Sequence, residues 1–186
     1  MRKLVIILLF LLPCIIARAQ FKYYEKGHDS YTSGNFDAAI QNFSEYLSKP
    51  TRDKALDVEV FYLRALSYYK KQDYKKAVDD FEEAILLDHN NKGNIYWFKA
   101  KSFDKLGLYN ESVSDYTSAI RELGSDKQIK AKLLYERSQE YVKLGNLVTA
   151  YEDLESGMAA HPGNADIKRE LDKLSKQETV IASRGA

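Results

Sequence analysis

The sequence predicts an all-α protein in which about four helical hairpins form a solenoid, closed by a capping helix at its C-terminal end. The main observation is a pattern that recurs between Gln20 and Asn164. No strand-like alternation separates the repeats, and an amphipathic segment follows the last of them. Self-similarity at a period of roughly 20 to 50 residues is typical of solenoids, in which each unit covers its neighbour's apolar face.

Each repeat is predicted to be a helical hairpin, because small residues stand one helical turn from large ones on both sides of a central turn residue. A small side chain leaves space for a large side chain of the neighbouring helix. The repeats begin at Gln20, Val58, Gly93 and Ala131, and their turn residues are Gly34, Gln72, Gly107 and Gly145. The small residues are Gly27, Ala65, Ala100 and Ser138 before the turn, and Ala39, Ala77, Ser112 and Ala150 after it. The large residues after the turn are Phe36, Tyr74, Tyr109 and Leu147, then Phe43, Phe81, Tyr116 and Leu154.

This pattern resembles the tetratricopeptide repeat, a unit of about 34 residues with glycine at its centre. The resemblance covers about four fifths of the chain and implies a right-handed α-solenoid domain over residues 20–178. Its repeats would be 20–53, 58–91, 93–126 and 131–164, followed by a capping helix at 165–178.

The starts of the four repeats are 38, 35 and 38 residues apart. The first and third spacings exceed the family's unit by nearly one turn of helix, at about 3.6 residues per turn. We therefore expect the first helices of repeats two and four to begin a turn early, near Arg52 and Asp126. A longer loop is the alternative.

The C-terminal segment is predicted to be an amphipathic helix that covers the end of repeat four. Asn164 is a suitable N-cap, and Ile167, Leu171 and Leu174 form an apolar stripe on a helix whose other faces are charged. The periodicity stops near Glu178, and residues 179–186 are expected to form a flexible tail.

Residues 1–19 are predicted to be an export signal. Arg2 and Lys3 precede an apolar run from Leu4 to Ile16, and Ala17 and Ala19 are the small residues that a signal peptidase reads. This run is shorter than the roughly 20 residues of a membrane-spanning helix. We expect a mature chain that begins at residue 20, is periplasmic or secreted, and has no stable membrane insertion.

Two alternatives to cleavage at residue 20 remain open from the sequence. The apolar run could be retained as a membrane anchor, or Cys14 could be lipidated, since Leu11 and Cys14 match a bacterial lipoprotein signal while Pro13 suits it poorly. Cys14 is the only cysteine. A chain cleaved at residue 20 therefore forms no disulfide within itself.

The mature composition argues against nucleic acid as a partner and against catalysis. Loss of the signal leaves 25 basic and 27 acidic residues, whereas nucleic-acid-binding domains are basic. The sequence contains no motif for a nucleophile, a metal or a cofactor. The histidines lie in different repeats, and His89 and His161 are expected at the ends of second helices, where the helix dipole favours imidazole.

The family resemblance implies a concave groove lined by the first helices. The residues that line it stand at places 2, 5, 9, 12 and 13, counted from the first residue of each repeat. The predicted groove residues are Tyr24, His28, Tyr31, Tyr62, Tyr69, Trp97, Lys101, Lys105, Tyr135 and Gln139. Polar neighbours would be Glu59, Lys70, Asp104, Lys132 and Lys143, so positive charge exceeds negative. Tyrosine and tryptophan dominate interface hot spots, although an aromatic residue at place 5 can instead pack against the neighbouring first helix.

Some members of the family bind a terminal carboxylate through lysine and asparagine at fixed places. Here Tyr24, His28 and Leu63 occupy those places, so a chaperone C-terminus is not the expected partner. The sequence thus predicts an exported, non-catalytic adaptor that binds a protein or peptide segment in the cell envelope. The alternative is an envelope glycan-binding module, in which the aromatic side chains stack on sugar rings.

Overall fold

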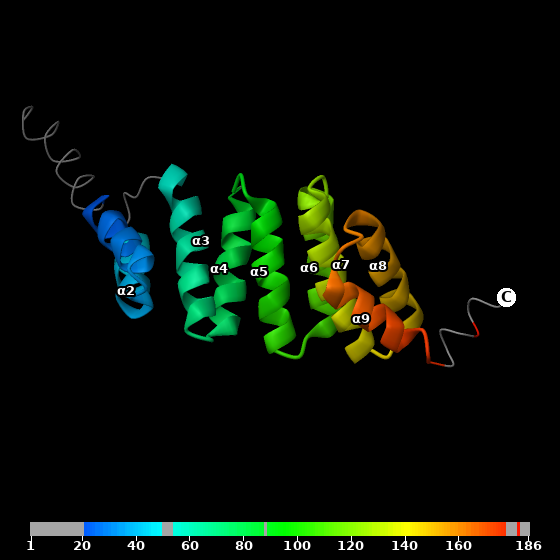
Figure 1. Cartoon of the computed structure of the whole chain (residues 1–186). Helices are drawn as coiled ribbons and strands as arrows, with labels where there is room; N and C mark the ends of the chain where they lie inside the picture. Colours follow the sequence, from blue (N-terminus) through cyan, green and yellow to red (C-terminus); the bar gives the residue numbers. More distant parts are fainter. Residues whose placement is uncertain (1–20, 50–53, 88, 178–181, 183–186) are drawn as a thin grey trace, which may run out of the picture. The chain divides into compact units, whose positions relative to one another are not determined.

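The computed structural model describes residues 21–49, 54–87, 89–177 and 182, and the regular elements in these ranges are all helices (Figure 1). The chain divides into two compact units, Met1–Asn90 and Asn91–Ala186. The predicted all-α class and the succession of hairpins are confirmed. The expected signal at 1–19, Arg52 and most of the expected tail lie outside the described residues.

The first unit contains two hairpins. Residues 21–32 are helical and pair with α2 (Phe36–Leu47), and α3 (Lys54–Lys70) pairs with α4 (Tyr74–Leu86). The first pair is so close that a Cβ atom on Gly27 would lie 2.5 Å from the Phe43 ring. α2 also packs on α3, so the two hairpins of this unit share a core.

The second unit contains two hairpins and a further helix. These are α5 (Lys92–Lys105) with α6 (Tyr109–Leu123), α7 (Lys127–Lys143) with α8 (Leu147–Ala160), and α9 (Ala165–Leu174). The helices of this unit pack mainly on their neighbours in the chain, most extensively within each hairpin. α9 begins after the N-cap Asn164, whose side chain accepts two backbone hydrogen bonds, and it ends before residue 178, the expected boundary.

The four hairpin turns share one backbone conformation. Gly34, Gly107 and Gly145 have φ values of 79°, 74° and 77°, and Gln72 has 63°. This left-handed region favours glycine, because a Cβ atom is strained there. Gln72 therefore adopts the turn that the repeat dictates, despite its side chain.

The spacing of repeats two and four is explained by longer first helices rather than by longer loops. α3 begins at Lys54, four residues before the repeat start at Val58. α7 begins at Lys127, and the Asp126 carboxylate accepts hydrogen bonds from the backbone N–H groups of Gln128 and Ile129 at 2.8 and 3.0 Å. Asp126 is thus an N-cap one turn before Ala131.

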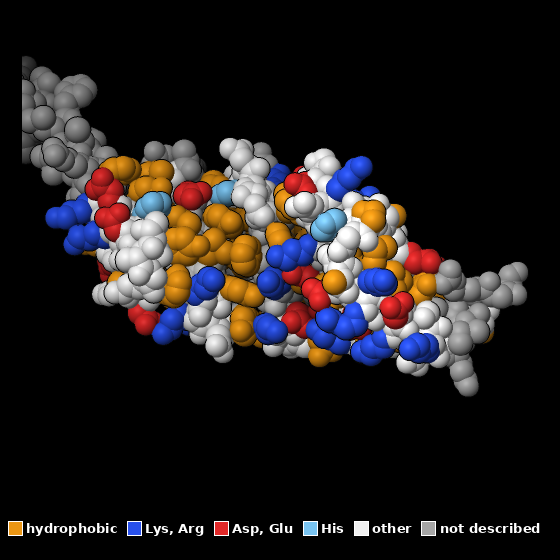
Figure 2. All heavy atoms as spheres, in the orientation of Figure 1, with side chains coloured by type: hydrophobic (Ala, Val, Ile, Leu, Met, Phe, Trp, Pro, Cys, Tyr) orange, Lys and Arg blue, Asp and Glu red, His pale blue; other side chains and the backbone are white. Residues whose placement is uncertain are grey.

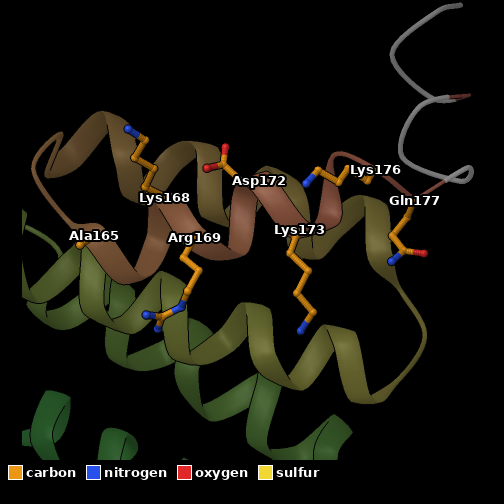
Figure 3. A pocket seen from close by; sticks show the side chains of 7 residues that line it. All are labelled: Ala165, Lys168, Arg169, Asp172, Lys173, Lys176 and Gln177. Carbon is orange, nitrogen blue, oxygen red and sulfur yellow. The ribbon is translucent and has the colours of Figure 1, made fainter.

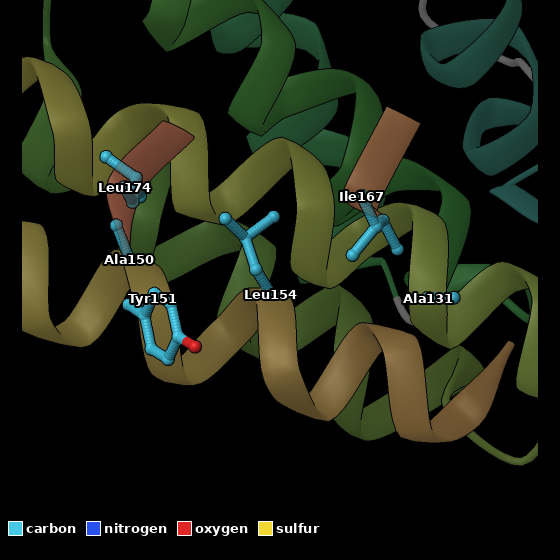
Figure 4. Packing of buried hydrophobic residues seen from close by; sticks show 6 residues of the cluster. All are labelled: Ala131, Ala150, Tyr151, Leu154, Ile167 and Leu174. Atoms are coloured by element: carbon cyan, nitrogen blue, oxygen red, sulfur yellow. The ribbon is translucent and has the colours of Figure 1, made fainter. Parts of the chain in front are cut away.

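The small residues of the pattern lie where helices approach most closely. Ala39, Ala65, Ala77, Ala100 and Ala150 each have 0% exposure. At the end of the second unit, α7, α8 and α9 share a buried cluster, shown in Figure 4. Its members are Ala131, Ala150, Tyr151, Leu154, Ile167 and Leu174. The amphipathic stripe predicted for α9 is therefore its buried face.

A half-buried arginine joins three consecutive helices in each unit. Arg64 of α3 donates from Nε and Nη2 to the Asp80 carboxylate on α4, both at 2.7 Å, and from Nη1 to Ser44 Oγ on α2 at 3.0 Å. The second unit repeats this arrangement, since Arg137 donates to the Asp153 carboxylate at 2.8 and 2.7 Å and to Thr117 Oγ1 at 2.8 Å. The two-point geometry fixes how each hairpin sits on the preceding helix.

In the second unit, the first hairpin has a weaker version of this contact. Lys99 of α5 pairs with Asp115 of α6 at 3.6 Å.

None of the helices in the described ranges combines the length and the apolar character that a membrane span requires.

We expect Ala77→Leu and Ala100→Leu each to lower the free energy of unfolding by about 1 to 3 kcal/mol, because both side chains are fully buried and overpacking strains the neighbouring helix. Urea unfolding followed by circular dichroism measures the change. Ala159→Leu, at an exposed position of α8, is the matched control and should leave the midpoint nearly unchanged. Equal effects at all three positions would contradict the packing described here.

Candidate partner-binding surface

The predicted groove residues divide between the two units. Tyr24, His28, Tyr31, Tyr62 and Tyr69 belong to the first unit, and the remaining five to the second. Each set is therefore described within its own unit.

In the first unit, three predicted residues share one face of the helix at 21–32. Tyr24, His28 and Tyr31 are spaced by four and three residues, so their side chains follow one another along the helix. The Tyr24 and His28 rings have centroids 6.1 Å apart. His28 is exposed, whereas Tyr24 and Tyr31 are half-buried, so this face is available to a partner.

α3 contributes Glu59 and Tyr62, which are neighbours on its surface. His89, which follows α4, lies against both: its ring centroid is 4.8 Å from that of Tyr62, and its Nε2 is 3.1 Å from Glu59 Oε2. The His89 side chain is 10% exposed and that of Glu59 is 40% exposed. His89 stands just beyond the end of α4, as expected, and its side chain also contacts Glu59, an acid of the predicted groove.

Burial, and to a smaller extent the Glu59 carboxylate, raises the pKa values of the three tyrosines. Burial raises the pKa of Tyr62 to about 12, with further contributions from Tyr31 and Glu59. Burial and then Glu59 also raise the pKa values of Tyr24 and Tyr31. All three hydroxyls therefore stay protonated near neutral pH, and they make no hydrogen bond within the described part of the chain. They are free to donate one to a ligand.

We call Tyr24, Tyr31, Tyr62 and Glu59 the tyrosine surface. Figure 2 shows hydrophobic side chains, a class that includes tyrosine in that view, at the molecular surface over α3. Tyr69 lies further along α3 and packs edge-on against Tyr74, with ring centroids 5.6 Å apart.

In the second unit, Trp97 packs between α5 and α7. Its Nε1 donates a hydrogen bond to Glu136 Oε2 at 2.5 Å, and its ring contacts the buried cluster that contains Ala100 and Leu133. The Lys132 ammonium lies 4.7 Å from the ring centroid, within cation–π distance. Trp97 therefore packs against the neighbouring first helix, which was the alternative to groove contact in the sequence analysis.

A polar network that includes the buried Tyr116 and Glu140 joins α5, α6 and α7. A hydrogen bond links the Tyr116 side chain to Glu136, and burial, with the nearby carboxylates, raises the pKa of Tyr116 far above its usual range. Lys143 donates to Asp104 and, at 3.1 Å, to Glu140 Oε1. Glu140 is only 3% exposed, and its Oε2 accepts no hydrogen bond within the described part.

Two carboxyl groups of this network are shifted in opposite directions. Burial raises the pKa of Glu140, although the hydrogen bond from Lys143 opposes the change. For Asp104, burial also acts to raise the pKa, but hydrogen bonds from Lys143 and Lys105 outweigh it and the pKa is lowered. The network thus stabilises the ionised form of Asp104 and disfavours that of Glu140, each relative to the free side chain.

The other four predicted groove residues of this unit take no part in the hydrogen bond between Trp97 and Glu136. The Lys101 ammonium lies 6.0 Å from the Phe98 ring centroid, and exposed Lys105 pairs with Asp104 at 3.2 Å. Tyr135 packs against the buried cluster of α7, α8 and α9. Gln139 Nε2 donates to Ser138 Oγ at 3.4 Å.

A shallow depression on α9 was not predicted. Figure 3 shows Arg169 and Lys173 extending from one side of this helix and Lys168 and Asp172 from the other. Arg169 pairs with Asp166 at 2.7 Å, and Lys173 with Glu170 at 3.4 Å, so charges on the helix itself compensate these two. The lining residues are Ala165, Lys168, Arg169, Asp172, Lys173, Lys176 and Gln177.

The sequence did not predict the contacts of His89 at the tyrosine surface, nor those of Glu136 and Glu140 near Trp97. Among the described residues, no group of histidine, cysteine and acidic side chains could hold a metal ion. A signal existed for the arginine contacts, since arginine and aspartate recur at places 7 and 23 of repeats two and four.

We expect Trp97→Ala to lower the free energy of unfolding by about 3 kcal/mol, because the ring packs on a buried cluster and its N–H bonds Glu136. Trp97→Phe keeps a ring and should lose less. Urea unfolding of both variants tests this. Unchanged stability of Trp97→Ala would mean that the ring is free for a partner.

We expect Glu140→Gln to flatten the pH dependence of stability. Because the folded-state pKa of Glu140 is raised above its ordinary value of 4.5, its contribution to the free energy of unfolding is full below that value and is lost as pH rises through the folded pKa. Stability of the wild type should therefore fall relative to the variant from pH 4.5 to neutrality. Glu152→Gln, exposed on α8, should run parallel to wild type, and the same behaviour by Glu140→Gln would contradict the assignment.

Comparison with known proteins supports the repeat assignment. Residues 58–91, which form repeat two, match the tetratricopeptide repeat family. Human Tetratricopeptide repeat protein 12 is 33% identical over 84% of this chain and 21% of that protein. The DnaJ homolog subfamily C member 7 homolog of Dictyostelium discoideum is 24% identical over 80% of this chain and 29% of that protein. The chain thus spans between about a tenth and a third of the length of these and other curated relatives that it matches.

Solved structures show the same fold. A crystal structure of MamA protein superposes with a TM-score of 0.74 at 17% identity, covering 87% of this chain and 83% of that chain. The second TPR domain of human RPAP3, solved in complex with an HSP70 peptide, superposes with a TM-score of 0.57 at 26% identity, covering 67% of this chain and 100% of that chain. Residues 58–91 are therefore a tetratricopeptide repeat, and the hairpins around them have the fold of tetratricopeptide repeat proteins.

Proposed function

We propose that the protein is an exported, non-catalytic adaptor that binds an extended segment of another protein on the faces of its first helices. The observation that carries this proposal is the tyrosine surface. Its three rings are half-exposed, and its hydroxyls make no hydrogen bond within the described part. Such side chains offer large contact area, few rotatable bonds and a polar edge, which are the properties of interface hot spots.

The likeness to RPAP3 supports a peptide as the ligand, because that domain was solved with a peptide bound. The partner proposed here differs from a chaperone C-terminus. A terminal carboxylate needs cations at its site, whereas the first unit offers Tyr24, His28 and Leu63 at the matching places and adds the carboxylate of Glu59.

Export is proposed from the sequence of residues 1–19 alone, and the cell envelope follows as the place of action. Intact mass of the protein recovered from its expressing cells tests this part. A mass that begins at Gln20 supports export, a lipid-modified Cys14 would place the protein on a membrane surface, and an uncleaved chain would overturn the proposal.

Binding is tested by selecting random linear peptides with the purified protein. We expect selected peptides to bind the wild type and to bind Tyr24→Ala at least about tenfold more weakly, as a hot-spot residue requires. Tyr23→Ala is the matched control, because Tyr23 is the adjacent half-buried tyrosine and has Lys49 5.4 Å from its ring centroid. Melting curves of both variants separate lost binding from lost folding.

Two outcomes would count against the adaptor. Selection could yield no peptide while purified wall glycans bind and are lost with Tyr24→Ala, which would favour the glycan-binding module. Equal weakening by Tyr23→Ala and Tyr24→Ala would mean that the tyrosine surface is not the site.

A further inference from the structure

The second unit has a lysine over the aromatic ring at place 5 of its first repeat, and the first unit has no such pair at the matching places. Trp97 stands at place 5 of repeat three, and Lys132, at place 2 of repeat four, holds its ammonium 4.7 Å from the ring centroid. Tyr24 stands at place 5 of repeat one, and the residue at place 2 of repeat two is Glu59. A carboxylate therefore occupies the place where the other unit has a lysine.

Among the described residues, this substitution leaves the tyrosine surface without a lysine or arginine contact, and His89 is the basic side chain beside Glu59. Lysine or arginine lies within 6.0 Å of many other aromatic rings of the described part, among them Tyr23, Tyr68 and Tyr141. The rings of Tyr24, Tyr31 and Tyr62 have no such contact within the described ranges. The faces of these rings carry negative potential, and Glu59 adds a full negative charge beside them.

We infer that the tyrosine surface binds a cationic side chain, lysine or arginine, of the partner segment, with Glu59 as its counter-ion. This inference rests on the proposed function and names the partner's chemistry. A cation at this place is attracted by the carboxylate and by the ring faces together, as in aromatic cages for ammonium groups. An anionic segment would instead meet the repulsion of Glu59.

The contacts of Glu59 suit this role. His89 Nε2, 3.1 Å away, orients Oε2, while Oε1 makes no hydrogen bond within the described part. The side chain is 40% exposed, so an incoming ammonium or guanidinium can reach it. The half-buried tyrosine rings also limit screening by solvent, which strengthens the pairing relative to a fully exposed ion pair.

The test uses the peptides selected by the purified protein, each compared with a version in which its basic residue is replaced by neutral norleucine. We expect the selected peptides to share a lysine or arginine, and its replacement to weaken binding to wild type about tenfold. Glu59→Gln should bind the original peptide about as weakly and should no longer distinguish it from the norleucine version, as coupled partners require. Glu83→Gln, on exposed α4 surface of the same unit, is the charge-matched control and should behave as wild type.

Ring chemistry supplies a second readout. Tyr24→Phe keeps the π face and should retain most of the preference for the basic peptide, whereas Tyr24→Leu should lose it. Selected peptides that lack a basic residue, or an equal effect of Glu59→Gln and Glu83→Gln, would overturn the inference and leave the adaptor proposal standing.

If no peptide is selected, the adaptor proposal fails and the cation site is tested directly. Nα-acetyl-lysine methylamide should shift the NMR signals of the tyrosine surface more than neutral Nα-acetyl-norleucine methylamide does. The difference should disappear in Glu59→Gln. Identical shifts with both compounds would overturn the site.

Discussion

Close approach of paired helices is the constraint on which the rest of this structure depends. Two helices can come together only where a small side chain faces a large one, as Gly27 faces the Phe43 ring. Because these positions recur at fixed places, every hairpin forms with nearly the same geometry. That geometry decides which side chains of the first helices remain at the surface, and hence which residues a partner can meet.

Much of the fold could be predicted from sequence because its determinants are local. The turn residue and the small residues mark each hairpin, and capping explains the early start of α7 at Asp126. The arginine contacts were harder to predict. Arg64 and Asp80 lie on different helices and Ser44 on a third, so their meeting depends on the register of three elements at once.

For the candidate site, the sequence predicted which face of each first helix is involved, but not the contacts of the individual side chains. Place numbers identify which side of a helix Tyr24, Tyr62 and Trp97 occupy, but the environment of each depends on what the neighbouring helix presents. Trp97 meets Glu136 and Lys132 and is held in packing, whereas Tyr24 and Tyr62 meet Glu59. The contacts of His89 with Glu59 and Tyr62 were missed because His89 lies beyond the helical pattern, where periodicity gives no direction for a side chain.

The dominance of contacts between consecutive helices has a kinetic consequence. In the second unit, α5 to α9 pack mainly on helices that are adjacent in the chain, so most stabilising contacts join residues that are near in sequence. Chains of this kind close short loops as they fold, and they fold faster than proteins of similar size with distant pairings. They also behave as nearest-neighbour arrays, in which a terminal element can open while the rest stays folded. Opening of α9 alone would expose Leu154 and its neighbours on α8, and it would leave the α5–α6 hairpin intact.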